Sequence, residues 1–399
     1  METSSNNTNS MVLATNGLRY IMPKPLSTTL VRTFKKQYSQ RQTYSSTDTI
    51  VFDLNVTGQV DPELSYLVLK VSSDGDFAFG QNGVLSLIRD IRISSKNGVE
   101  LDRIQSFNAW SHLYLSHMVD SDKINKDGRL AGVNTESLQN VAHVFCVPLS
   151  WLSGLFRPHV KGQKVPSHML SGARIEIQLE SVARALQSPA GGPSTQYTVE
   201  SPTLVLMEHT LNDNSLKILT EESSNNGLEY VYDRVFTSIE TSSNSIVNTQ
   251  IKKAVSQATS VITTVHDPSK QNAIVENSFD SLDISSSNVF KKFQYRLGSN
   301  YFPHQAVDTE EEAYRVTEST YDNKTVVSAN TWINYLLKFF AVGVPLKTEH
   351  SISSSGLAVN NSATIALEFE GDSSNKVYYT FLVYTALART FLQQTTVKI

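Results

Sequence analysis

The sequence has 399 residues and only one cysteine, Cys146, so no disulfide bond can form within the chain. A chain without disulfides fits a protein that folds in a reducing compartment. Cys146 lies in the run VAHVFCVPL, between Phe145 and Val147. Because a free cysteine behaves as a small hydrophobe, we expect a buried apolar side chain here and favour this interpretation over a reactive thiol.

The sequence also lacks a secretory signal and a run of residues that could span a membrane. The first ten residues, METSSNNTNS, are polar and do not have the apolar region of a signal peptide. The longest apolar stretch, TWINYLLKFFAVGV, contains Asn334 and Lys338 and is shorter than the ~20 residues that a membrane helix needs. We therefore expect a soluble intracellular product with no membrane anchor of its own.

Sequence motifs typical of catalysis or nucleotide binding are missing. The chain contains no HExxH, no H-x-H, no G-x-x-x-x-G-K-[ST], no G-x-G-x-x-G and no G-x-S-x-G. His112 and His117 are five residues apart on a predicted helix, which places them roughly 140° apart around its axis. We expect no metal, no cofactor, no small-molecule substrate and no enzymatic activity. The sequence leaves open a pair of carboxylates for sugar hydrolysis, because the spacing of such a pair is three-dimensional.

An acidic run at Glu310, Glu311 and Glu312 has two interpretations. It could hold a divalent cation. The simpler reading, which we favour, is that negative charge stabilises the N-terminus of a helix.

Charged residues are scarce, at 18% of the chain, and the formal net charge is −4. Serine, threonine and asparagine are abundant and gather between apolar runs. This composition favours strands joined by polar loops over long helices. A chain of this length most often forms two domains.

Acidic residues are absent from residues 4–47, and this segment differs in charge from the rest of the chain. It carries six cations: Arg19, Lys24, Arg32, Lys35, Lys36 and Arg41. We interpret residues 1–44 as a basic N-terminal arm and expect the strands to begin at Thr49. The excess of positive charge indicates an anionic neighbour, and a solvated tail is an equally weighted alternative. Aromatic residues interleave with the cations, so the arm could contact DNA or lock a neighbouring subunit, which we favour slightly.

Period-two patterns predict strands in the first half of the chain. In residues 49–56, alternate apolar side chains share one face. An Asn97-Gly98 pair predicts a hairpin with a type I′ turn between two further strands. The period then changes, and Phe107, Trp110, Tyr114 and Met118 predict a helix with Ser106 as its N-cap. The other strands predicted here are 64–71, 85–94, 99–104, 141–149, 173–180 and 197–209.

After a polar linker at residues 211–228, the pattern of strands starts again. Asp308 with Glu311 indicates the start of a second short helix. Residues 250–267 fit a strand or a helix, and their end favours a strand. The remaining strands are predicted at 230–239, 279–285, 293–302, 363–369 and 377–399.

The two halves therefore repeat one order of elements, although their sequences differ. Each half predicts several strands, a short helix, and more strands, with turn signals suited to an eight-stranded sandwich. We predict two sandwiches, at residues 45–210 and 229–399, each with a helix that plugs one of its ends.

Several segments resemble parts of double jelly-roll major capsid proteins. They are DRIQSFNAW after the hairpin, TVESPTLVLMEHTL, FQYRLGSNYFPHQAV and the final strand VYYTFLVYTALARTF. The resemblance covers roughly residues 45–399 and is greatest to the proteins of Polinton-like viruses, virophages and related double-stranded DNA viruses. It implies an all-β fold, with two eight-stranded antiparallel jelly rolls in tandem and short helices in the loops between strands.

The same resemblance implies a function. Proteins of this family form pseudo-hexameric homotrimers that tile an icosahedral shell around the genome. The expected partners are two more copies of the chain, neighbouring capsomers, penton proteins, and minor capsid or cement proteins. The basic arm would face inward, towards viral DNA or an internal membrane. The expected location is the virion capsid, after assembly inside the host cell.

A carbohydrate-binding or carbohydrate-cleaving β-sandwich is the alternative function. Such sites usually present aromatic platforms, and the chain has three tryptophans, Trp110, Trp151 and Trp332. The helix core already accounts for Trp110. A receptor-binding spike is a third and weaker hypothesis, because the chain lacks the repetitive shaft of such fibres.

Overall fold

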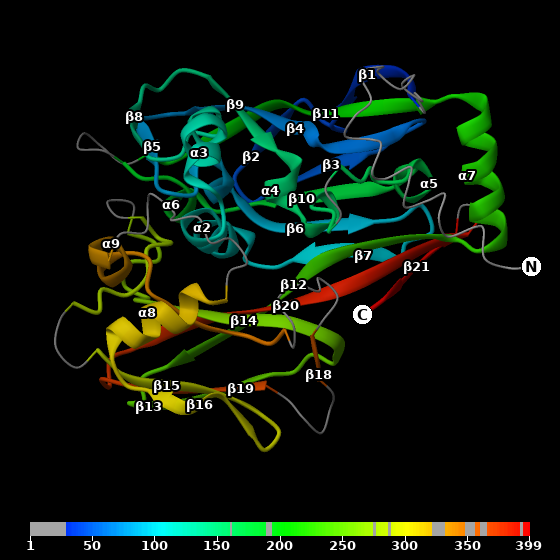
Figure 1. The fold of residues 1–399 in the computed structure, drawn as a ribbon. Helices are drawn as coiled ribbons and strands as arrows, with labels where there is room; N and C mark the ends of the chain where they lie inside the picture. The colour runs from blue at the N-terminus through cyan, green and yellow to red at the C-terminus, as the bar shows by residue number, and fades with distance from the viewer. Residues whose placement is uncertain are drawn as a thin grey trace, which may run out of the picture.

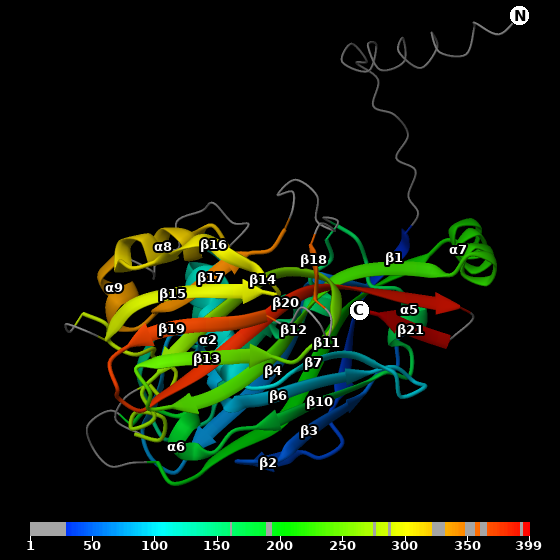
Figure 2. The same ribbon diagram turned by 90° about the horizontal axis from the view of Figure 1, so that it is seen from below.

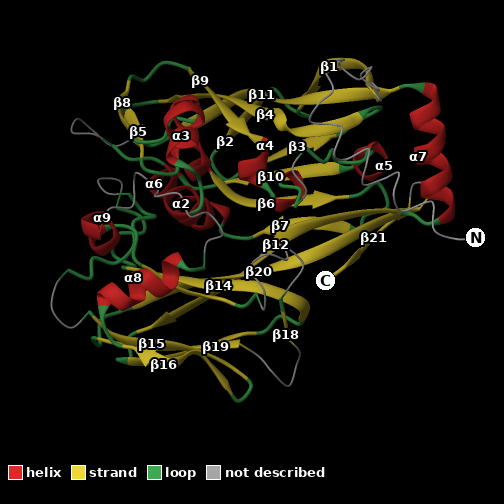
Figure 3. Cartoon of the chain, viewed as in Figure 1, coloured by secondary structure: helices red, strands yellow, loops and turns green. Residues whose placement is uncertain are grey.

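The computed structural model describes residues 29–159, 162–188, 194–273, 277–285, 289–320, 332–347, 356–359, 365–391 and 394–399. Strands dominate, and they form two sandwiches that lie against each other (Figure 1). The first sandwich, blue to green, lies above the second, which runs from green through yellow to red. Figure 3 shows that most helices lie at the ends of the strands, outside the sheets.

The first sandwich contains eight principal strands in two antiparallel sheets. One sheet has the order β1-β11-β4-β9 and the other β3-β10-β6-β7. The strands are β1 (Thr29–Tyr38), β3 (Thr49–Asp53), β4 (Gln59–Ser73), β6 (Ile88–Ser94), β7 (Glu100–Ile104), β9 (His143–Pro148), β10 (Arg174–Leu179) and β11 (Tyr197–Leu211).

The second sandwich is built in the same way. Its sheets have the orders β12-β20-β14-β17 and β13-β19-β15-β16. The strands are β12 (Leu228–Ser242), β13 (Ile246–Ile251), β14 (Val255–His266), β15 (Phe290–Leu297), β16 (Asn300–Val307), β17 (Ala341–Pro345), β19 (Ile365–Gly371) and β20 (Lys376–Phe391).

Both sandwiches have one topology. When the eight principal strands of either sandwich are numbered along the chain, the sheets read 1-8-3-6 and 2-7-4-5. This is a jelly roll, in which two antiparallel sheets exchange strands through Greek-key connections. The predicted tandem of two eight-stranded jelly rolls is confirmed. The described residues also form five short strands. β2 (Thr43–Ser45), β18 (Leu357–Val359) and β21 (Gln394–Lys398) extend the sheets of the sandwiches, whereas β5 (Phe77–Phe79) and β8 (Thr135–Leu138) pair only with each other.

The prediction that strands begin at Thr49 is wrong. Thr29–Tyr38, which we assigned to the basic arm, is the first strand of the first jelly roll and pairs antiparallel with β11. The period-two signal is hidden because the large residues of this edge strand point outward, with Phe34 opposite Met207. Its inner side includes Lys35, which bonds to the buried Glu208. The other predicted domain bounds stay predictions.

The two predicted helices occupy the same place in the two topologies. α2 (Phe107–His117) follows the fifth principal strand of the first jelly roll, and α8 (Glu310–Glu318) and α9 (Trp332–Leu337) follow the fifth strand of the second. All three lie at the left end of the molecule in Figure 1. α7 (Asp213–Asn225), in the predicted linker, lies at the opposite end. The short helices are α3 (Ser121–Lys123), α4 (Leu149–Leu152), α5 (Ser167–Leu170), α6 (Val182–Ala185), and the 3-10 or π turns η1 (Gly83–Leu87), η2 (Ile124–Gly128) and η3 (Gly154–Phe156).

Both predicted helix caps differ from the structure. Ser106 precedes α2, but its φ is 49° and its side chain caps nothing; its N–H donates to Asp90 Oδ1 at 2.9 Å. Thr309, one residue after Asp308, caps α8 by accepting from the N–H of Glu312 at 3.3 Å. A hydroxyl three residues before a glutamate satisfies the capping box as well as a carboxylate does.

The Asn97-Gly98 hairpin is present, but its turn is not type I′. Gly98 has a φ of 77°, whereas Asn97 is not among the residues with a positive φ. The N–H of Ser95 donates to Val99 O at 2.8 Å, and that of Gly98 to Ser95 O at 2.9 Å. A turn followed by one left-handed glycine shifts the register of β6 on β7 between Ile93 and Ser94.

The strand predictions in the second half need four changes. Residues 279–285 form no strand in the structure. Residues 250–267, left open between helix and strand, end β13 and form β14. Residues 293–302 belong to a hairpin of two strands, β15 and β16, and the predicted final strand is β20 followed by β21. In the predicted strand 363–369, the first two residues lie outside the described part of the chain.

Cys146 is half-buried and does not lie in the core, so this prediction is wrong. Its neighbours Phe145 and Val147 are buried. Successive side chains of a strand point to opposite faces, and Cys146 therefore lies on the outer face of β9, opposite Val68 on β4. Burial raises the pKa of its thiol.

None of the described helices is long and apolar enough to cross a membrane.

Candidate functional site: the junction between the two sandwiches

β12, the first strand of the second sandwich, lies along β7 and η3 of the first (Figure 1). Three hydroxyl groups of β12 donate to backbone carbonyls across this junction. Tyr230 Oη reaches Leu155 O at 2.8 Å, Tyr232 Oη reaches Leu101 O at 2.5 Å, and Thr237 Oγ1 reaches Gln105 O at 2.7 Å. Tyr230 and Tyr232 are fully buried, so these bonds satisfy polar groups that have no access to water.

A buried charge cluster lies beside these hydroxyls. Arg234 Nη2 donates to Glu100 Oε1 at 2.9 Å, and its Nε is 3.6 Å from Asp102 Oδ1. Ser153 Oγ donates to the other oxygen of Asp102. Burial raises the pKa of Asp102, although Arg234 and Ser153 act in the opposite direction. The guanidinium therefore links two carboxylates of the first sandwich to a strand of the second.

Glycine is required where the two backbones come closest. A Cβ added to Gly154 would lie 1.6 Å from the backbone oxygen of Asp233 on β12. No side chain fits into that distance. The absence of a side chain at Gly154 lets η3 approach β12 closely enough for the hydrogen bond of Tyr230 to Leu155 O to form.

α2 makes the second part of the junction. Trp110 is 1% exposed and its ring centroid is 5.3 Å from that of Phe381 on β20. The ring of His117 donates from Nε2 to Phe339 O at 3.0 Å. Side chains of both sandwiches form one continuous apolar cluster. The predicted helix lies at a sandwich end, as expected, and it also holds the two sandwiches together.

Three histidines close to this junction are buried and uncharged at neutral pH. Burial lowers the pKa of His117 to about 4, and that of His112 and His266 to about 3. His112 Nε2 lies 3.8 Å from Asp280 Oδ1. In the part of the chain that the structure describes, no three histidine, cysteine, aspartate or glutamate side chains are placed to hold a metal ion.

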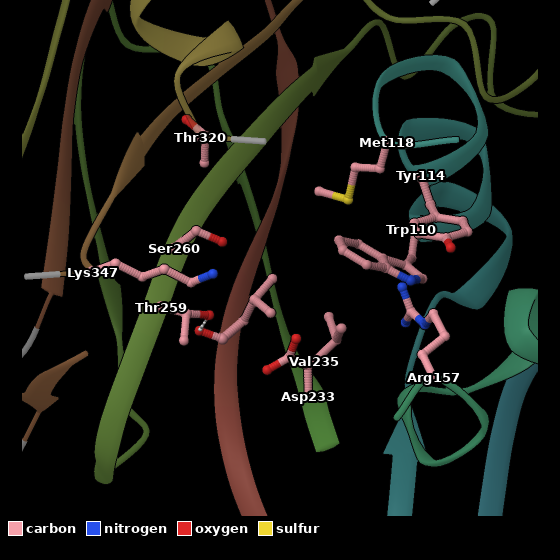
Figure 4. Close-up of a pocket in the computed structure, with 11 residues that line it drawn as sticks. Trp110, Tyr114, Met118, Arg157, Asp233, Val235, Thr259, Ser260, Thr320 and Lys347 are labelled. Atoms are coloured by element: carbon pink, nitrogen blue, oxygen red, sulfur yellow. Dashed lines mark hydrogen bonds between the residues drawn. The ribbon is translucent and has the colours of Figure 1, made fainter. Parts of the chain in front are cut away.

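A pocket of about 180 Å³ opens between α2 and the second sandwich. Figure 4 shows the indole ring of Trp110 extending towards it, with Tyr114 and Arg157 behind and Lys347 on the opposite side. Asp233 of β12 also lines it. Its wall combines aromatic surface with charges of both signs, and it contains none of the residues predicted from sequence to form a site.

The predicted basic residues do not form one patch in the described structure. Lys35 pairs with Glu208, whose carboxylate also accepts from the N–H groups of Thr57 and Gly58. Arg41 pairs with Asp48 at 3.4 Å and lies 4.7 Å over the ring of Tyr44. Arg32 and Lys36 are exposed on β1, and Arg19 and Lys24 lie outside the described residues. The inward-facing role of these six residues stays a prediction.

The junction was missed by sequence reasoning, and one signal could have indicated it. Tyr230, Tyr232 and Arg234 alternate on β12 and point to one face. An arginine on the apolar side of a predicted strand indicates a buried carboxylate partner, because a buried charge without one is costly.

The acidic run Glu310–Glu312 forms the first turn of α8, as the simpler interpretation expected.

Comparison by sequence finds no matching family model and no matching curated protein. Solved structures do match over nearly the whole chain. The PBCV-1 virus capsid model has a TM-score of 0.70 at 10% identity, and covers 95% of this chain and 99% of that one. The Sputnik virophage structure has a TM-score of 0.65 at 10% identity, with 96% and 91% covered. The Faustovirus major capsid protein has a TM-score of 0.63 at 9% identity, with 94% of each chain covered.

These likenesses concern the fold alone, because a sequence identity near 10% does not allow the role of a single residue to be transferred from those proteins to this chain. They agree with the strand order found in both sandwiches. The chain has the double jelly-roll fold of viral major capsid proteins such as that of Faustovirus.

Proposed function

We propose that this chain is a structural major capsid protein located in the virion. The observation that carries the proposal is the duplication: two jelly rolls of identical strand order are fixed to each other by a buried junction. A rigid pair of similar units is what a shell-forming subunit needs. The likeness to capsid proteins over at least 91% of each of the three structures supports the same function.

In this proposal three copies associate about a threefold axis as a pseudo-hexameric capsomer. Six similar sandwiches from three chains give a nearly hexagonal outline, and hexagons tile an icosahedral shell around a genome with few gaps. Closed symmetry lets one interface serve the whole trimer. Neighbouring capsomers, penton proteins and minor capsid or cement proteins would be the further partners. The role is architectural, and the proposal assigns no catalytic group and no cofactor.

The proposal includes a direction for the basic segment. Thr29, at the start of β1, pairs with Leu211, two residues before α7 begins. The chain before β1, with Arg19 and Lys24, therefore joins the molecule at the α7 end, opposite α8 and α9 (Figure 2). We propose that this end faces the viral DNA or an internal membrane, and that the basic segment contacts it or locks a neighbouring subunit.

The carbohydrate-binding alternative gains no support from the tryptophans. Trp110 and Trp151 are 1% and 2% exposed, and only Trp332 is accessible, at 37%. Buried rings cannot serve as a platform for a sugar.

Light scattering after size-exclusion chromatography tests the proposal. We expect a stable species with three times the chain mass of 44.3 kDa, and negative-stain images of the purified assembly should show hexagonal particles. A species that stays monomeric at high concentration would refute the proposed capsomer.

A further inference from the structure

The two sandwiches differ in how the outer face of one sheet is covered. In the second sandwich, the outer face of the β12-β20-β14-β17 sheet is buried under the first sandwich. Trp110 of α2 packs on Phe381, and Arg184 Nη2 donates to Tyr379 Oη at 2.7 Å. Phe381 and Tyr379 are at most 3% exposed. The helix-containing segment that follows the fifth strand of the first sandwich, which we call its excursion, therefore covers a sheet of the second sandwich.

The topologically equivalent sheet of the first sandwich has an apolar outer face that is open in the described structure. We call it the sheet face. Large side chains lie exposed on it, with Phe34 at 58%, Tyr38 at 69% and Val144 at 61%. The register places Tyr66 opposite both Val205 and Pro148, and the Phe34 and Tyr66 rings are 6.5 Å apart. An exposed apolar patch of this kind marks an interaction surface.

The excursion of the second sandwich, which corresponds in position to the segment with α2, also has apolar side chains that are exposed in the described structure. The excursion after β16 contains α9, whose outer side chains we call the helix face. Trp332 is 37% exposed, Ile333 65% and Leu337 37%. Trp332 is held in place by rings on its inner side, with its centroid 5.9 Å from that of Tyr335. A six-residue helix that presents a preorganised aromatic ring and two aliphatic side chains is suited to protein contact.

We infer that the helix face of one copy packs on the sheet face of the next copy, and so repeats between chains the junction that α2 makes within the chain. The inference rests on the proposed function and adds the surfaces that join the subunits. The sheet of β1 lies along the top of the molecule in Figure 1, whereas α9 lies at its left side near mid-height, so the two surfaces are separate within one copy. Such a head-to-tail contact closes into a ring when the rotation per copy fits.

The charges of the two surfaces agree with this arrangement. Arg32 and Lys36 lie on the sheet face, where they stand opposite His209 and Val205 of β11. The excursion that carries the helix face begins with three glutamates, Glu310–Glu312, in the first turn of α8. α8 and α9 are joined through the rings of Tyr314 and Trp332, whose centroids are 5.8 Å apart. Opposite charges at the rim of an apolar contact favour one orientation of the partners.

Two double variants and one control test the inference by light scattering. F34E/Y38E places charge on the sheet face, and I333E/L337E places it on the helix face. Either variant should convert the trimer into a monomer, with no change in thermal unfolding of the isolated chain because the four side chains are exposed. The control I218E lies on α7, where Ile218 is 66% exposed, and it should remain trimeric.

Mixing the two variants distinguishes a head-to-tail contact from a symmetric one. The sheet-face variant keeps its helix face, and the helix-face variant keeps its sheet face. An equimolar mixture should therefore form a heterodimer of twice the chain mass and no larger species. Failure of the mixture to associate would overturn the inference, as would trimers formed by either variant alone.

The single cysteine gives a second readout. Cys146 lies beside Val144 on the sheet face and is half-buried. Alkylation of its thiol by a maleimide should be at least tenfold slower in the trimer than in the monomeric helix-face variant. Equal rates would contradict the location of the contact. A wild-type chain that is monomeric would instead refute the proposed capsomer, so the two failures can be told apart.

Discussion

The guanidinium of Arg234 lies 2.9 Å from the carboxylate of Glu100, and this ion pair connects strands that are 134 residues apart in the chain. Arg234 is 8% exposed, and behind it the carboxylate of Asp102 is 1% exposed. One cation thus neutralises buried negative charge in the other sandwich. Loss of this contact would destabilise both jelly rolls, because Arg234 in one and Asp102 in the other would stay buried without their opposite charge.

Replacing Arg234 by methionine should lower the free energy of unfolding by about 3 to 5 kcal/mol, since the buried Asp102 would lose its counter-charge. Urea denaturation followed by fluorescence measures this change. The matched control is R92M. Arg92 also approaches Glu100, at 3.7 Å, but is 50% exposed, and its loss should cost less than about 1 kcal/mol. Equal effects of the two substitutions would show that the Arg234 contact does not stabilise the junction.

Replacing Gly154 by alanine should separate the backbones at the junction. The new Cβ would meet the oxygen of Asp233 at 1.6 Å, so η3 and β12 must move apart, and we expect a loss of about 3 kcal/mol or more. G128A is the control, because a Cβ there has no neighbour closer than 3.4 Å. A thermal midpoint for G154A within 2 °C of that for G128A would contradict the prediction.

Stability should decrease in mild acid because of the buried histidines. Burial lowers the pKa of His117 from 6.5 to about 4 in the folded chain. The unfolded chain therefore takes up the proton first. The contribution of this group is fully present above pH 6.5 and is lost as the pH falls from 6.5 towards 4, by roughly 3 kcal/mol at pH 4.

The variant H117Q isolates this effect. A glutamine amide can still donate to the carbonyl of Phe339, but it does not titrate. Between pH 6.5 and 5, the free energy of unfolding should fall less steeply with pH for H117Q than for the wild type, and the difference in slope should correspond to roughly 0.5 of a proton at pH 6.5 and roughly 0.9 of a proton at pH 5. Above pH 7.5 the two proteins should show the same dependence. Parallel curves across the whole range would mean that His117 is not the group that titrates.

Local pattern predicted most of the strands because a strand buries alternate side chains whatever lies beyond it. Ile50 and Phe52 in β3 show this, since both are fully buried as expected. The same reasoning failed for β1, where Phe34 and Tyr38 point outward and a lysine points inward to Glu208. It failed for Cys146 because apolar neighbours in a strand lie on the face opposite to the residue between them.

The sequence by itself determined the class of the fold, the duplication of the strand order and the place of both helices, because period and turn chemistry are properties of neighbouring residues. Only the tertiary structure decided which outer faces are covered. Phe381 is buried under Trp110 of α2 and Tyr379 is buried beside Arg184 of α6, whereas Phe34 and Tyr38 on the equivalent sheet are exposed. Both pairs follow the same short-range pattern, and the difference arises from contacts between residues hundreds of positions apart.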